Sequence, residues 1–176
     1  MALYFTQKGL QKLETQISAE EAVAKKAGEN AGEAAGAGCD WHDNADYEDA
    51  LRRLELGSRR VLDLREETRN AVIVEIQEQT GRVSIGNTVR VTLQYRGAVS
   101  EIRQEFTIGA YRESDPKNGL ITYDSPLARV LIGKEEGDSV EGVSIGDRVI
   151  EELTIDEILP PSEKYNSLIQ KFYGTE

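Results

Sequence analysis

Apolar and small side chains repeat at helical spacing over the first part of the chain. From Thr6 to about Gly38 there is no proline, and these side chains follow alternating steps of three and four residues, which indicates one face of an α-helix. Thr6 belongs to the residue types that cap the start of a helix. A second series with the same steps begins at Tyr47. The first series is Leu10, Leu13, Ile17, Glu20, Ala24, Ala27, Ala31 and Ala34, and the second is Tyr47, Leu51, Leu54, Ser58, Val61, Arg65, Thr68 and Val72.

Two such stripes joined by a short polar segment predict an antiparallel helical hairpin. At 1.5 Å per residue each helix would be roughly 45–50 Å long, which is too long for a compact globule of this size, so the hairpin should project. Glycines accumulate toward the turn, where alanines replace leucines in the first stripe. Because small residues facing Tyr47, Leu51 and Leu54 allow close helix approach, we expect a slender tip.

Beyond Val74 the spacing changes to the alternation of β-strands, with glycines between the segments. Strands are predicted near residues 89–95, 102–108, 120–123 and 153–155, and one or two helical turns over residues 125–134. The predicted fold class is α+β, a coiled-coil hairpin followed by a mostly β domain. The predicted domains are the hairpin at 1–76, the β-rich domain at 77–160 and a polar C-terminal tail at 161–176, with one amphipathic turn near Leu168, Ile169 and Phe172.

The chain has 21 lysines and arginines against 32 aspartates and glutamates, a formal charge of −11 at pH 7. Because proteins bind duplex DNA mainly by neutralising its phosphates, this balance argues against independent DNA binding. No apolar run approaches the ~20 residues that cross a bilayer, and the N-terminus lacks a signal-peptide pattern. The single Cys39 excludes an internal disulfide. These observations predict a cytoplasmic protein with no membrane partner.

Negative charge is concentrated at the predicted tip of the hairpin. Asp40 and Asp43 are three residues apart, so both carboxylates can point the same way. Mg²⁺ takes one or two protein carboxylates and fills its other positions with water and phosphate oxygens, so this pair is suited to a metal that another molecule also holds. Helix capping is the alternative, and the spacing alone favours it. The ten residues 40–49 have no lysine or arginine and five acids, Asp40, Asp43, Asp46, Glu48 and Asp49.

Behind the tip lies a group of lysines and arginines that we call the basic band. Antiparallel pairing places its members at similar heights, roughly 20 Å back from the turn. The band can hold a phosphate backbone in a partner's channel, or it can be a solvated helix surface, because several members lie four residues after an acid. Both interpretations stay open. The band consists of Lys25, Lys26, Arg52, Arg53, Arg59 and Arg60.

Other chemistry is excluded by the residue inventory. Cys39 and His42 are too few for structural zinc, which needs four nitrogen or sulfur ligands. With His42 as the only histidine, a Ser-His-Asp triad in the β-rich domain is impossible, and no phosphate-binding glycine loop occurs. In the segment 125–134, Leu127, Val130 and Leu131 favour core packing over an interface.

Two separate segments carry a family resemblance. Asp40-x-x-Asp43-Asn44-Ala45-Asp46-Tyr47 resembles the tip motif D-x-x-E-N-A-E-Y of the bacterial Gre transcript-cleavage factors. Ser125-Pro126-Leu127-Ala128-Arg129 and Leu131-Ile132-Gly133-Lys134-Glu135 resemble the C-terminal signature of the same family. The resemblance covers about residues 3–158 in the family's order.

The resemblance implies a coiled-coil hairpin with an FKBP-like C-terminal domain, a monomer that is not itself an enzyme. It implies binding to RNA polymerase, with the hairpin in the secondary channel near the nascent RNA 3′ end. Asp40 and Asp43 then help to hold the second catalytic Mg²⁺ jointly with the polymerase, which cleaves the backtracked RNA, and no Mg²⁺ is bound stably by this chain alone. The implied polymerase-binding residues are Ser125, Pro126, Leu127, Ala128, Arg129, Leu131, Gly133 and Lys134.

Two alternatives to a cleavage factor remain. One is a non-catalytic regulator that enters the same channel and inhibits transcription. Asp43 and Asp46 stand where the family motif has glutamate, and a misplacement near 1 Å costs about a hundredfold in rate. The other is a prolyl isomerase, which needs an apolar aromatic pocket, although the only tryptophan, Trp41, lies outside the β-rich domain.

Overall fold

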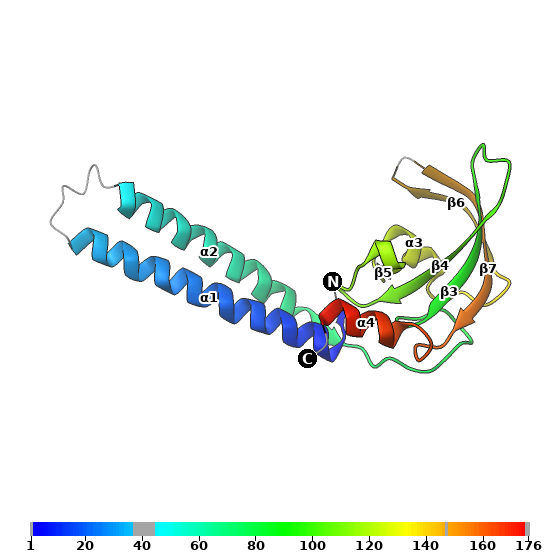
Figure 1. The fold of residues 1–176 in the computed structure, drawn as a ribbon, viewed down its shortest axis with the longest axis horizontal. Helices are drawn as coiled ribbons and strands as arrows, with labels where there is room; N and C mark the ends of the chain where they lie inside the picture. The colour runs from blue at the N-terminus through cyan, green and yellow to red at the C-terminus, as the bar shows by residue number, and fades with distance from the viewer. Residues whose placement is uncertain (1, 37–44, 147, 175–176) are drawn as a thin grey trace. The chain divides into compact units, whose positions relative to one another are not determined.

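The computed structural model describes residues 2–36, 45–146 and 148–174. The chain divides into two compact units, Met1–Ile73 and Val74–Glu176. Figure 1 shows two long helices in the first unit and a sheet with short helices in the second. The predicted α+β class, with a helical hairpin followed by a β-rich domain, is confirmed.

The first unit is a hairpin of α1 (Gln7–Gly36) and α2 (Ala45–Arg69), which lie side by side in Figure 1. The hydroxyl of Thr6 accepts a hydrogen bond from the backbone N–H of Gly9 at 3.1 Å, which confirms the predicted cap. At the base of the hairpin, β1 (Leu3–Phe5) pairs in parallel with β2 (Ala71–Ile73). The predicted helical stripe extends to Val72, but the structure places this residue in β2.

The face that α2 turns toward α1 differs from the predicted stripe. Ala50 is buried whereas Leu51 is 40% exposed, so the smaller of these neighbours occupies the interface. At Gly57 an added Cβ would lie 3.2 Å from the Cβ of Ala24, which shows how closely the helices approach there. The predicted stripe is therefore partly wrong, because Leu51 and Ser58 are exposed. Val61 is buried as predicted, and Arg65 is exposed but pairs with Glu21 of α1. The buried residues of α2 are Ala50, Val61 and Leu64.

The second unit is built on a five-stranded sheet with the order β5-β4-β3-β7-β6. Only β4 and β5 are parallel neighbours, and the other pairs are antiparallel. A 3₁₀ turn, η2 (Pro116–Asn118), precedes β5. The strand β6 was not predicted, and β7 extends well beyond the predicted residues 153–155. The strands are β3 (Thr88–Tyr95), β4 (Ile102–Gly109), β5 (Leu120–Thr122), β6 (Ser139–Ile145) and β7 (Arg148–Leu159).

One face of this sheet forms the hydrophobic core. The alternating residues Val89, Val91 and Leu93 of β3 are fully buried, as the period of two predicts. They belong to one cluster with residues of β7 and of the short helix α3 (Pro126–Leu131). The core therefore fixes α3 to the sheet.

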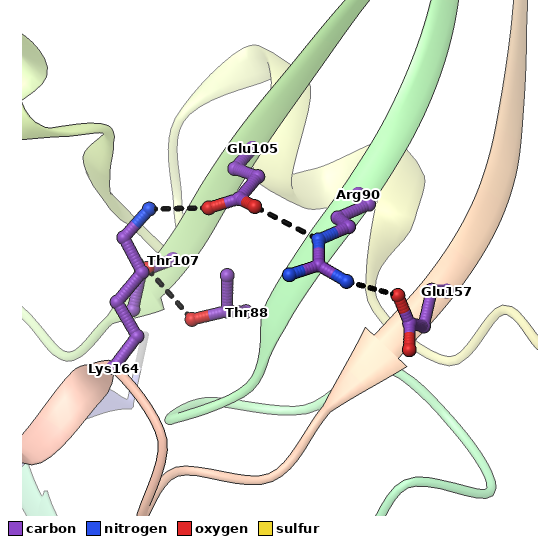
Figure 2. Close-up of polar contacts among 6 residues, drawn as sticks. All are labelled: Thr88, Arg90, Glu105, Thr107, Glu157 and Lys164. Carbon is purple, nitrogen blue, oxygen red and sulfur yellow. Dashed lines mark hydrogen bonds and ion pairs between the residues drawn. The ribbon is translucent and has the colours of Figure 1, made fainter.

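The opposite face of β3 is polar. Figure 2 shows Arg90 between Glu105 of β4 and Glu157 of β7, and it bonds to both. Glu105 also accepts a hydrogen bond from the ammonium of Lys164 at 2.6 Å. The hydrogen bonds from Lys164 and then Arg90 lower the pKa of the Glu105 carboxyl below its usual value. These contacts join three strands and the residue that precedes the last helix.

That last helix, α4 (Tyr165–Tyr173), lies in the segment predicted as a polar tail. Tyr165 and Ile169 are buried against Leu120 of β5, so this segment is packed into the second unit. The fully buried carboxylate of Glu113 accepts hydrogen bonds from the hydroxyls of Tyr165 at 2.7 Å and Tyr173 at 2.8 Å. The backbone N–H of Ala110 donates a third bond to it at 2.9 Å. The expected amphipathic turn is thus a docked helix.

We expect Tyr165→Phe to lower the free energy of unfolding of the second unit. The variant should also lose less of this free energy as the pH rises into the alkaline range. Burial, and then the neighbouring Glu113 carboxylate, raise the pKa of Tyr165 above its usual value of 10.0. Because the pKa of Tyr165 is higher in the folded than in the unfolded chain, its buried contact stabilises the fold fully below about pH 10. This stabilisation is lost at higher pH, because the tyrosine of the unfolded chain ionises first. Losing one donor to a buried carboxylate costs about 1–3 kcal/mol.

Thermal unfolding at several pH values from neutral to alkaline measures this effect. Tyr4→Phe is the matched control, because Tyr4 is 41% exposed and lies in the first unit. If the melting temperatures of Tyr165→Phe equal those of the unaltered protein and fall equally with rising pH, the buried contact contributes nothing to stability.

Candidate functional site

The predicted metal-binding residues lie outside the described part of the chain. The segment 37–44, with Asp40 and Asp43, connects the end of α1 at Gly36 to the start of α2 at Ala45. Among the described residues no group of three or more histidines, cysteines, aspartates or glutamates could hold a metal ion. Two carboxylates offer the oxygen ligands that Mg²⁺ prefers, but only part of its coordination shell. They fit a metal whose other ligands come from elsewhere.

The basic band lies on both helices of the hairpin, as predicted. Two of the expected acid–base pairs are present, between Arg53 and Asp49 at 2.6 Å and between Arg59 and Glu55 at 3.9 Å. Arg60 instead reaches across to Glu20 of α1 at 3.0 Å. Because these arginines are 61–72% exposed, such pairs contribute little stability and can be exchanged for phosphate contacts.

Among the described residues, Glu21 and Lys25 do not form the pair that their four-residue spacing predicts. Lys25 pairs with Glu29 at 3.9 Å, while Glu21 pairs with Arg65 of α2 at 2.6 Å. Within residues 2–36 and 45–146, neither Lys26 nor Arg52 forms an ion pair. The described structure therefore contains both paired and unpaired members of the band, and both interpretations of it remain predictions.

The signature segment 125–134 forms α3 and the turn after it. The hydroxyl of Ser125 accepts a hydrogen bond from the backbone N–H of Ala128 at 3.2 Å, and Pro126 occupies the first turn, so both residue types start the helix for local reasons. Gly133 has a φ of +82°, which favours glycine, and its N–H donates to the carbonyl of Val83 at 2.8 Å. The turn thereby pairs with the segment before β3.

The same segment separates core residues from surface residues. Leu127 and Leu131 are buried in the core and Val130 is partly buried against it, which confirms the predicted core packing of these three side chains, and Ala128 is buried with them. The exposed side chains are those of Pro126, Arg129 and Ile132. Ile132, which is 37% exposed, was not singled out from the sequence, although an isoleucine after the last helical residue was the available signal.

Comparison with known proteins identifies the family. The model described as "Transcription elongation factor, N-terminal" matches residues 3–73, and the one described as "Transcription elongation factor, GreA/GreB, C-term" matches residues 77–158. Transcription elongation factor GreA of Christiangramia forsetii is 34% identical over 140 residues, which are 78% of this chain and 85% of that protein. The chain belongs to the GreA/GreB transcription elongation factor family.

Two further GreA proteins agree with this assignment over different lengths. The GreA protein of Bacillus cereus is 32% identical over 77% of this chain and 84% of its own length. The match to GreA of Nautilia profundicola has 37% identity and covers 58% of this chain and 61% of that protein. Among solved structures, the crystal structure of GreA factor homolog 1 (Gfh1) protein of Thermus thermophilus has 21% identity and a TM-score of 0.41, over 90% of this chain and 99% of that one.

The GreA/GreB matches cover both motif regions but stop before the last helix. The N-terminal model includes the acidic segment, and the C-terminal model includes α3. The helix α4 begins at Tyr165, seven residues after the match ends at 158. Within the described residues, no helix combines the length and the apolar character needed to cross a membrane.

Proposed function

We propose that this protein acts on bacterial RNA polymerase and stimulates the polymerase's own cleavage of backtracked RNA. In this proposal the hairpin enters the secondary channel and brings the acidic segment to the nascent RNA 3′ end. The observation that carries the proposal is the place of the Asp40-x-x-Asp43 motif, which joins the far ends of two long paired helices. A family member with this arrangement can deliver two carboxylates deep into a partner. Such a role belongs in the cytoplasm.

Asp40 and Asp43 would share one Mg²⁺ with the polymerase. A bound Mg²⁺ supplies charge stabilisation and a more acidic water for phosphodiester hydrolysis. The two carboxylates of this chain would hold and orient one side of that metal, while the polymerase supplies the remaining ligands and the catalytic site. The protein is then an activator in trans and not an enzyme.

The basic band and the signature segment 125–134 support the proposed role at the polymerase. The exposed members of the basic band offer phosphate contacts to RNA along the hairpin, since their ion pairs are weak. On the second unit, the exposed residues Pro126, Arg129 and Ile132 of the signature segment offer a polymerase contact, while the buried members of that segment hold them in place.

Backtracked polymerase–RNA complexes with labelled transcripts test the proposal directly. Adding the protein should shorten the RNA by releasing a 3′ fragment and should restart extension when nucleotides follow. Binding to the polymerase without any shortening, under conditions where the polymerase cleaves slowly by itself, would contradict cleavage stimulation.

A non-catalytic channel regulator is the second candidate function. The observation that favours it is Asp43, which is one methylene shorter than the glutamate of the family motif. A regulator would slow nucleotide addition on active complexes and leave backtracked transcripts at full length, so the same assay distinguishes the two functions.

A further inference from the structure

A hollow in the second unit combines two arginines with a tyrosine. It has a volume of about 430 Å³ and is lined by Tyr95, Arg96, Arg148 and Val149, at the end of β3 and the start of β7. The backbone holds this corner together, because the N–H of Arg96 donates to the carbonyl of Val149 at 2.9 Å. We call this feature the arginine–tyrosine hollow.

The two arginines of the hollow are held differently, and both are accessible. The guanidinium of Arg148 lies over the ring of Tyr95, 5.9 Å from the ring centroid, a cation–π contact that favours this orientation of its planar donors. Arg96 lies 4.0 Å from Glu151, and both of these side chains are more than half exposed, so this pair is weak. An incoming negative group can therefore engage both guanidinium groups without breaking a strong contact.

The surroundings of the hollow determine what it can bind. Residues 76–176 contain 11 lysines and arginines against 17 aspartates and glutamates, and one of these acids, Glu151, lies 4.0 Å from Arg96 of the hollow. A nucleic acid needs an extended basic surface for its regularly spaced phosphates, whereas the second unit has more acids than bases. A single carboxylate is compact and matches the planar fork of arginine donors. The charge pattern thus favours a short acidic segment of a protein.

An exposed apolar side chain close to Arg96 in the sequence adds to this interface character. Val99 is fully exposed in the loop after β3, three residues from Arg96, and the backbone N–H of Ala98 bonds to the carbonyl of Tyr95. Tyrosine and arginine are the residue types enriched at the energetic centres of protein interfaces. The loop and the hollow together therefore offer an apolar contact at Val99 and polar contacts at the two arginines.

We propose that the arginine–tyrosine hollow docks an acidic segment of RNA polymerase, in addition to the contacts expected of the hairpin and of α3. The inference rests on the proposed function, because that function supplies the partner. Arg148, positioned by Tyr95, and Arg96 form charge-assisted hydrogen bonds with carboxylates of that segment. The hollow then helps to anchor the second unit while the hairpin acts elsewhere.

Binding of the full-length protein to immobilised core RNA polymerase, free of nucleic acid, tests this contact. The double variant Arg96→Gln/Arg148→Gln should bind about thirtyfold more weakly, the effect of losing one interface hot spot. Arg148→Lys should lie between, because lysine keeps the charge but not the planar fork. Arg103→Gln is the matched control, since Arg103 is an exposed arginine that lines other hollows on the polar sheet face, and it should bind like the unaltered protein.

Three results would overturn the inference, each in a different way. Equal affinity of the double variant and the unaltered protein would show that the hollow makes no contact. A defect that arises only when an RNA–DNA scaffold is present would assign the arginines to nucleic acid. A failure of the unaltered protein to bind core polymerase would contradict the proposed function and this inference with it. Thermal melting of each variant verifies the fold, and Arg148→Lys retains a charge at the site if the double variant is unstable.

Discussion

Asp40→Asn and Asp43→Asn should each abolish transcript cleavage while leaving polymerase binding unchanged. An amide keeps the size of the carboxylate but removes the negative charge that a divalent metal requires. Because the metal must be held in a productive position, we expect a loss of roughly a hundredfold or more in the rate of RNA shortening. Rates on backtracked complexes, measured at saturating protein, separate this loss from weaker binding.

Two further variants sharpen this prediction. Asp43→Glu restores the residue of the family motif and should cleave at least as fast as the unaltered protein. Asp49→Asn removes a nearby acid, which in the described structure is engaged with Arg53, and should leave the rate unchanged. Unaltered cleavage in both Asp40→Asn and Asp43→Asn would eliminate the metal role and favour helix capping for this pair.

Leu131→Ala should lower the stability of the second unit, and Ile132→Ala should weaken polymerase binding, although the two residues are adjacent. Leu131 is fully buried in the sheet core, so its truncation leaves a cavity and should lower the free energy of unfolding of the second unit by about 2–5 kcal/mol. Ile132 is 37% exposed, so its truncation should change that free energy by less than about 1 kcal/mol. Chemical denaturation monitored by circular dichroism measures both.

Polymerase affinity gives the second readout for this pair. Ile132→Ala should weaken binding several-fold with little change in stability, because its side chain is on the surface of the signature segment. A stable Leu131→Ala protein would contradict the assignment of Leu131 to the core. Unchanged affinity of Ile132→Ala would remove this side chain from the proposed contact.

The features that could be predicted from the sequence are those set by neighbouring residues. The cap at Thr6 depends on a backbone N–H three residues away, and the buried side of β3 follows from strict alternation at Val89, Val91 and Leu93. The start of α3 at Ser125 and Pro126 is equally local. Each of these needs no knowledge of the distant chain.

The features that were missed depend on partners far along the chain or on broken patterns. The inner face of α2 follows Ala50 and Gly57, because close helix approach selects small residues that a hydrophobicity pattern ranks below Leu51. In β6 the alternation is interrupted at Gly142, which has a φ of +70°. The docking of α4 depends on Glu113, a buried carboxylate more than fifty residues earlier. The tip residues Asp40 and Asp43 lie outside the described residues, so their role stays a prediction.

The docked helix α4 sets the minimum length at which the second unit can be studied. Trimming the chain at residue 158, where the family match ends, would uncover the buried Leu120 and take both tyrosine hydroxyls away from Glu113. A buried carboxylate that loses two hydrogen-bond donors in an apolar site destabilises its surroundings. A family boundary is therefore the wrong place to cut this protein, and a fragment meant to represent its second unit has to extend through Tyr173.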